Sequence, residues 1–119
     1  MIGNVEKKRG GAGSPPRKVR KIANIDKLRD PHHFEMVLNA IGSNTRMKIM
    51  RIVSKEAKPI RQIAREMGLS QAACSAQVKI LWSVGFLKRE RRGNQTFYLL
   101  NKSLFLDFQR IVREYLEID

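Results

Sequence analysis

Outside residues 85–100, apolar residues recur at three- and four-residue steps from residue 31 to residue 116, and the breaks between these runs predict five helices. The first helix starts at Asp30-Pro31, where Asp is a typical N-cap and Pro suits the first helical position. Gly42 is expected to end it. The apolar face of this helix consists of Phe34, Val37, Leu38 and Ile41.

The next two runs predict a pair of short helices. Ser43 or Asn44 caps the first of them, and Pro59 closes the connection to the second, which stops at Gly68. The inner face of the first carries Met47, Met50 and Val53, with Ile49 and Ile52 beside it. The inner face of the second carries Ile60, Ile63, Ala64 and Met67.

The fourth helix is expected to start after Ser70 as its N-cap and to end before Gly85. Its buried stripe consists of Cys74, Val78, Leu81 and Val84. The opposite side carries small and hydrogen-bonding residues, namely Gln71, Ala72, Ser75, Ala76 and Lys79. This helix therefore has one side for packing and a different chemistry on the side left to solvent.

Residues 87–92 and 95–100 predict two short strands joined at Gly93-Asn94, a two-residue hairpin turn. Which alternate residues of the second strand face inward is left undecided. Asn101 then caps a last helix. Its wide apolar stripe consists of Leu104, Phe105, Phe108, Ile111, Val112, Tyr115 and Leu116.

The order of these elements predicts a mainly α fold with a small β-wing: about five helices and a two-stranded antiparallel hairpin, as in a winged helix-turn-helix. In such folds one helix enters the DNA major groove and the hairpin lies against the backbone beside it. Gln71 suits the major-groove edge of adenine, Ser75 can donate or accept, and Ala72 suits a thymine methyl. Small surface residues are also ordinary helix formers, so the turn before this helix and the ribbon after it decide for DNA.

The ribbon is strongly basic, and phosphate contacts from it would give affinity and register rather than sequence preference. Its cations are Lys88, Arg89, Arg91 and Arg92, with Gln95 adjacent. A charged edge hairpin could instead serve to prevent edge-to-edge aggregation. Its position directly after a helix-turn-helix favours the DNA contact.

The chain of 119 residues has a formal net charge of +13, which favours a polyanionic partner such as nucleic acid. Residues 1–29 are rich in Lys, Arg, Gly and Pro and poor in apolar residues, which predicts a disordered basic tail before a single domain at 30–119. Whether that tail contacts DNA stays open. One cysteine, no secretory apolar segment and no long apolar run favour a cytoplasmic protein without membrane contact.

NTRMKIMRIV followed by IRQIAREMGLSQAACSAQVKILWSVGFLKRERRGNQTFYLL resembles the ArsR/SmtB-type winged helix-turn-helix repressors. The resemblance covers about residues 34–116 and implies homodimers, built from the first and last helices, that bind near-palindromic operators and release them on sensing a ligand. The expected dimer interface consists of Phe34, Val37, Leu38, Ile41, Phe105, Phe108, Val112 and Tyr115. MarR-like regulators, within the broader winged-helix class, remain an alternative.

The chain departs from metal-sensing members of that family. The helix before the turn has neither Cys nor His, and the last helix has no His. His32 and His33, the two histidines, have no further ligand nearby, so no metal and no cofactor are expected. Cys74 lies on the buried stripe, where an inert thiol is favoured over a redox switch. No catalytic constellation or phosphate-binding Gly loop is found, so an enzyme is not expected.

We therefore expect a dimeric transcriptional regulator, most simply a repressor, that reads duplex DNA with the helix at 70–84 and holds the backbone with the wing at 87–100. The expected DNA contacts are Ser70, Gln71, Ala72, Ser75, Ala76, Gln77, Lys79, Arg89, Arg91, Arg92, Gln95, Asn44 and Arg46. Two alternatives stay open: a sequence-tolerant architectural DNA binder and a winged-helix protein-interaction module. The operator, the effector and the direction of regulation do not follow from the sequence.

Overall fold

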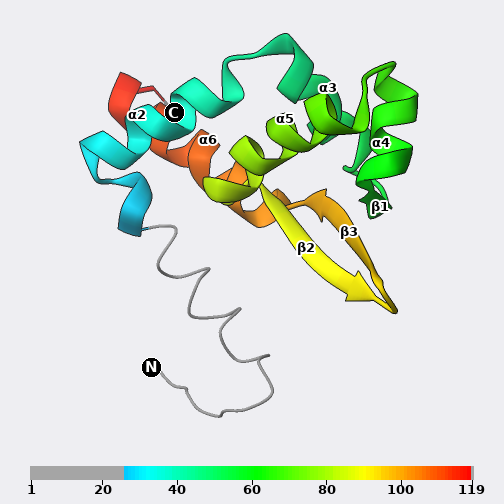
Figure 1. The fold of residues 1–119 in the computed structure, drawn as a ribbon. Coiled ribbons are helices and arrows are strands. Elements are labelled where there is room, and N and C mark those ends of the chain that lie inside the picture. The colour runs from blue at the N-terminus through cyan, green and yellow to red at the C-terminus, as the bar shows by residue number, and fades with distance from the viewer. Residues whose placement is uncertain (1–25, 119) are drawn as a thin grey trace.

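The computed structural model describes residues 26–118, most of which are helical. Residues 26–28 form a helical turn before the first full helix. The elements then follow in the order α2 (Pro31–Ile41), α3 (Asn44–Ile52), β1 (Lys58–Pro59), α4 (Ile60–Met67), α5 (Gln71–Ser83), β2 (Leu87–Arg92), β3 (Gln95–Leu100) and α6 (Lys102–Leu116). In Figure 1, α5 crosses the middle of the molecule, with α2 and α6 at one end and α3 and α4 at the other. The β2–β3 hairpin projects away from the helices.

Side-chain caps begin four of the helices, at the positions that the sequence predicts. The backbone N–H of His33 donates to Asp30 (3.0 Å) and that of Ala73 donates to Ser70 (3.1 Å). Ser43, rather than Asn44, caps α3, and Asn101 caps α6. Each cap satisfies a backbone donor that has no partner within its own helix, so these local sequence signals fix where the helices begin.

The core forms where the inner faces of the helices meet the base of the hairpin. Phe86 is fully buried, and its ring meets that of Phe108 edge-on at a centroid distance of 5.7 Å. The predicted stripe of α5 is confirmed, because Cys74, Val78, Leu81 and Val84 are all buried. The expected face of α3 needs one correction. Met47 is 44% exposed, and the buried residues of that helix are Ile49 and Met50, with Val53 buried directly after it.

The sheet has three strands rather than the expected two, in the order β1-β3-β2. Lys58 pairs with Tyr98 and Pro59 with Phe97, both antiparallel. Proline has no N–H to donate to a sheet ladder, so it is tolerated in a strand that lies at the edge. This short strand attaches the segment before α4 to β3, and it thereby joins the helix-turn-helix to the wing.

The packed region extends a few residues towards the N-terminus beyond the expected boundary at residue 30. Leu28 is only 1% exposed and belongs to the core, and the Arg29 guanidinium lies 2.8 Å from the Glu114 carboxylate on α6. Most of the predicted basic tail, residues 1–25, lies outside the described residues. Within residues 26–118, no helix has both the length and the apolar character needed to cross a membrane.

Candidate nucleic-acid interface

A tight turn sets the angle between α4 and α5. Gly68 ends α4 with a φ of 70°, a left-handed conformation that favours glycine, and Ser70 caps α5 two residues later. On the inner side, Ile63 and Ala64 of α4 are buried together with Cys74 of α5. The pair forms a helix-turn-helix, and α5 is held with its opposite side towards solvent.

The outward side of α5 carries the residues that the sequence predicts for base contacts. Gln71, Ala72, Ala76 and Lys79 are exposed, and Ser75 is half-buried. The residues on this side are small or flexible, so a groove edge could approach the helix axis closely. Within this part of the chain, the expected chemistry and the exposed surface coincide.

The cations of the wing lie on two faces of the hairpin rather than on one. Successive residues of a strand point to opposite faces, so Arg89 and Arg91 share the face of the buried Leu87. The Arg89 guanidinium carbon lies 3.8 Å from the centre of the Trp82 ring on α5. Stacking of this kind occupies the flat face of the guanidinium and leaves its in-plane N–H donors available. Trp82 therefore fixes Arg89 beside the C-terminal end of α5.

Arg91 lies next to the turn of the hairpin, where its Nε donates to the Gly93 carbonyl (3.2 Å). On the opposite face, Arg92 pairs with Glu90 and lies over the Phe97 ring, with 4.4 Å between the guanidinium carbon and the ring centre. Lys88 is exposed on that same face. The contact with Glu90 offsets part of the charge of Arg92, so Arg91 is the stronger candidate for a phosphate contact.

Arg46 and Gln77, both expected to contact DNA, form a hydrogen bond with each other. The Arg46 Nη1 donates to the Gln77 Oε1 at 2.7 Å, and both side chains are half-buried. Asn44 is exposed at the start of α3, and Gln95 is half-buried at the start of β3. The structure therefore places most expected contact residues on α5 and the wing, and it joins Arg46 of α3 to Gln77 of α5.

Two cations on α4 were not predicted from the sequence as DNA contacts. Arg61 and Arg65 are both exposed, and their four-residue spacing puts them on one side of the helix. The same spacing rule that identified the apolar face could have found them. In helix-turn-helix proteins the first helix crosses the DNA backbone, so these two arginines are further candidates for phosphate contacts.

The expected dimer interface needs a correction. Val37 is 0% and Phe108 7% exposed within a single chain, so both belong to the core of the protomer and are not free to pack against a second copy. Phe34, Ile41, Phe105 and Val112 are partly buried against that core, and Leu38 and Tyr115 are exposed. Further large apolar side chains that are exposed and were not predicted for the interface are Met36, Met47, Ile80, Leu106, Leu116 and Ile118.

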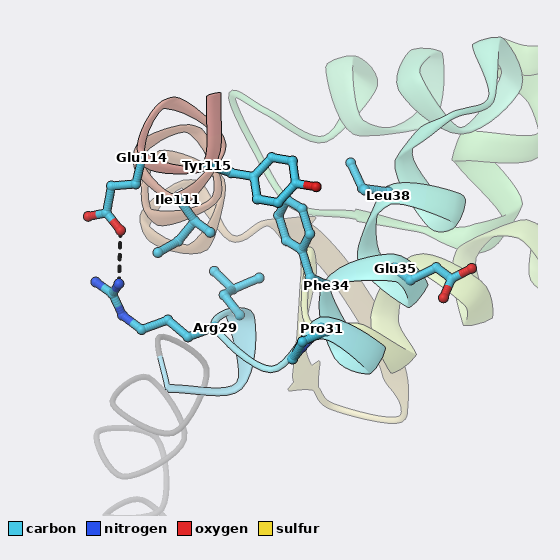
Figure 2. A pocket seen from close by; sticks show the side chains of 9 residues that line it. Arg29, Pro31, Phe34, Glu35, Leu38, Ile111, Glu114 and Tyr115 are labelled. Carbon is cyan, nitrogen blue, oxygen red and sulfur yellow. Dashed lines mark hydrogen bonds and ion pairs between the residues drawn. The ribbon is translucent and has the colours of Figure 1, made fainter. Parts of the chain in front are cut away.

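Leu38 and Tyr115 line one cavity of about 490 Å³ between α2 and α6 (Figure 2). The rings of Phe34 and Tyr115 lie 6.1 Å apart on its wall. The ion pair of Arg29 and Glu114 lies at its edge. The lining is otherwise mostly apolar, with Leu28, Pro31 and Ile111 completing it beside Glu35.

Cys74 is fully buried in α5, and burial raises the pKa of its thiol. A raised pKa keeps the group as a neutral thiol at neutral pH, and the thiolate is the reactive form. We expect the native protein to react with a thiol reagent at least tenfold more slowly than the urea-unfolded chain, which serves as the control. Rapid stoichiometric labelling of the native protein would instead favour the redox switch.

Among residues 26–118, no group of three His, Cys, Asp or Glu side chains could hold a metal ion.

Comparisons with known proteins agree on one fold. Residues 43–89 match the family of bacterial regulatory proteins of the arsR type. A transcriptional repressor SmtB homolog from Synechocystis sp. is 23% identical over 97 residues, which is 82% of this chain and 71% of that protein. An ArsR-like transcriptional regulator from Rhodococcus sp. RHA1 is similar in structure, with a TM-score of 0.66, 15% identity, and coverage of 71% of this chain and 79% of that one.

A second solved structure is similar over nearly the whole chain. It is the homodimeric winged helix-turn-helix DNA-binding domain of a possible ArsR-family transcriptional regulator from Mycobacterium bovis. The TM-score is 0.55 and the identity 16%, with 92% of each chain covered. At these identities the structural likeness concerns the fold, and the expected winged helix-turn-helix is confirmed.

Proposed function

We propose that this chain, which belongs to the ArsR/SmtB-type winged helix-turn-helix regulators, acts as a homodimeric repressor that binds duplex DNA at specific sequences. One observation carries the proposal. The outward side of α5 presents small and hydrogen-bonding residues, while the neighbouring hairpin presents cations. Major-groove reading needs the first property and phosphate binding the second.

The two parts have different roles in this proposal. The base edges are contacted by Gln71, Ala72, Ser75 and Ala76, with Ser70 at the start of the helix. Lys79 and the wing residues Arg89, Arg91, Arg92 and Gln95 hold the backbone, with Asn44 at the start of α3. Arg61 and Arg65 add phosphate contacts from α4. Such contacts are salt-dependent and largely independent of sequence, so they give affinity on any DNA.

The dimer of this proposal is formed through α2 and α6. Two copies of the apolar surface around Leu38 and Tyr115 would cover each other across a two-fold axis. The same symmetry would set two α5 helices about one DNA turn, roughly 34 Å, apart. The expected operator is therefore near-palindromic. The proposal assigns the chain no enzymatic activity and places its action in the cytoplasm.

The first experiment is to map the genomic fragments that the purified protein retains and to compare the affinity for one of them with that for random duplex. A specific regulator should show a ratio on the order of a thousand or more. A ratio near one with strong salt dependence would indicate an architectural DNA binder. Failure to bind any duplex would leave the protein-interaction module.

Truncating the reading side of α5 should reduce discrimination. We expect Gln71→Ala or Ser75→Ala to cost about 1–3 kcal/mol on the mapped site and much less on random duplex, because base contacts form only on the correct sequence. Arg91→Ala is the contrasting control. It should weaken binding to both duplexes and reduce the salt slope by about 0.9 for each phosphate that is no longer neutralised. Equal losses on both duplexes for the α5 variants would contradict the assigned roles.

A further inference from the structure

The Arg46 side chain joins three helices. It extends from the first turn of α3 back to the end of α2, where its Nε donates to the Ala40 carbonyl (2.6 Å) and its Nη2 to the Asn39 carbonyl (3.2 Å). Its Nη1 donates to the Gln77 Oε1 in the middle of α5 (2.7 Å). One planar guanidinium thus uses three of its donors on two other helices, a geometry that the single ammonium of lysine cannot reproduce.

The contacts of Arg46 complete the C-terminal end of α2. The last four carbonyls of a helix have no partner within it. Gly42 N–H donates to the Leu38 carbonyl (3.0 Å) and Ser43 N–H to the Ile41 carbonyl (2.8 Å), and the remaining two carbonyls accept from Arg46. The last turn of α2 has no basic residue of its own, so Arg46 also brings a positive charge to its partially negative end.

Gln77 is the other end of this connection. It lies next to the buried Val78 on α5 and is half-buried, as is Ser75, whereas the base-reading candidates Ala72 and Ala76 are exposed. Because its amide oxygen accepts from a cation, the bond is stronger than one between neutral groups. That bond ties the middle of α5 to the corner between α2 and α3.

We propose that Arg46 is a positioning residue. Through Gln77 it fixes the position of α5 against the corner between α2 and α3, and it thereby raises operator affinity without contacting DNA. The inference rests on the proposed function. It replaces the expected DNA contacts of Arg46 and Gln77 by a link within the protein. The end of α2 lies beside Leu38 of the proposed dimer surface, so the same link relates the subunit interface to the helix that reads the groove.

A phosphate contact and a positioning role predict different results. Arg46→Met keeps an unbranched apolar stem but no donors, and Arg46→Lys keeps the charge but not the fork. Under the proposal, both variants bind the mapped site about tenfold more weakly or worse, with a salt slope like that of the wild type. Gln77→Ala also weakens binding, and the double variant Arg46→Met/Gln77→Ala is no weaker than Arg46→Met alone.

Three results would overturn the inference. The first is an Arg46→Lys variant that retains wild-type affinity while Arg46→Met reduces the salt slope by about 0.9 per subunit, as removal of a phosphate-binding cation would. The second is additive losses from Arg46→Met and Gln77→Ala. The third is wild-type affinity in Gln77→Ala, the variant to rely on if the Arg46 variants fail to fold by circular dichroism. A wild-type protein with no sequence preference would instead remove the proposed function, and the inference with it.

Discussion

Leu38→Glu is expected to convert the protein from dimers to monomers and to weaken operator binding by a hundredfold or more. Leu38 is 43% exposed and lines the apolar cavity between α2 and α6. In the proposed dimer a glutamate there would be buried against the apolar surface of the second copy without a partner for its charge. Each subunit alone binds its half-site weakly, so the loss of the dimer also lowers the affinity for DNA.

Sedimentation measures the first effect and titration of the mapped duplex the second. Met47→Glu is the matched control, because Met47 is equally exposed, at 44%, but lies on α3 and not on the cavity. The control should stay dimeric. A wild-type protein that is already monomeric at micromolar concentration and still binds its site tightly would remove this architecture.

The helices and the hairpin could be predicted because their signals are local. Ser43, Ser70 and Asn101 each satisfy a backbone donor three residues ahead, and Gly93-Asn94 suits a two-residue turn. Neither signal depends on what lies elsewhere in the fold. Strand β1 has only two residues, one of them proline, and it exists only because β3 lies beside it. Its sequence carried no comparable signal.

Within the candidate site too, features set by local sequence patterns could be predicted and long-range contacts could not. Periodicity identified the outward side of α5, because the buried stripe through Cys74 and Val78 fixes the opposite side. The bond of Arg46 to Gln77 joins residues 31 positions apart, and no spacing rule connects them. The division of the wing cations between two faces, unlike this bond, could have been predicted from the sequence. The alternation of a strand would have predicted that Arg89 and Arg91 face away from Lys88 and Arg92.

Periodicity also fails to separate a residue that packs within the protomer from one that packs between protomers. Phe108 and Tyr115 lie seven residues apart, two helical turns, so they occupy nearly the same side of α6. Both rings approach Phe34, at 5.9 Å and 6.1 Å. Phe108 is nevertheless buried, because Phe86 and Phe105 also cover it, whereas Tyr115 is 75% exposed at the end of the helix. How deeply a side chain is buried therefore depends on the elements that pack around the helix and not on its spacing alone.

Phe108→Ala should therefore destabilise the protomer itself, by about 3–5 kcal/mol, since it removes a buried ring and leaves a cavity among Phe34, Phe86 and Phe105. A loss of that size is a large part of the stability of a small domain, so much of the protein should be unfolded at 37 °C.

Tyr115→Ala is the matched variant on the same helix. It should change the stability mainly through the dimer. Its effect on urea unfolding should therefore be near zero in dilute protein, where the wild type is also monomeric, and should grow to a plateau as protein concentration rises, because dimers form by mass action. The loss in Phe108→Ala should persist at every concentration, because its cavity lies within one chain. If instead the two variants showed the same concentration dependence, Phe108 would belong to the subunit interface and its burial within the single chain would not describe the protein in solution.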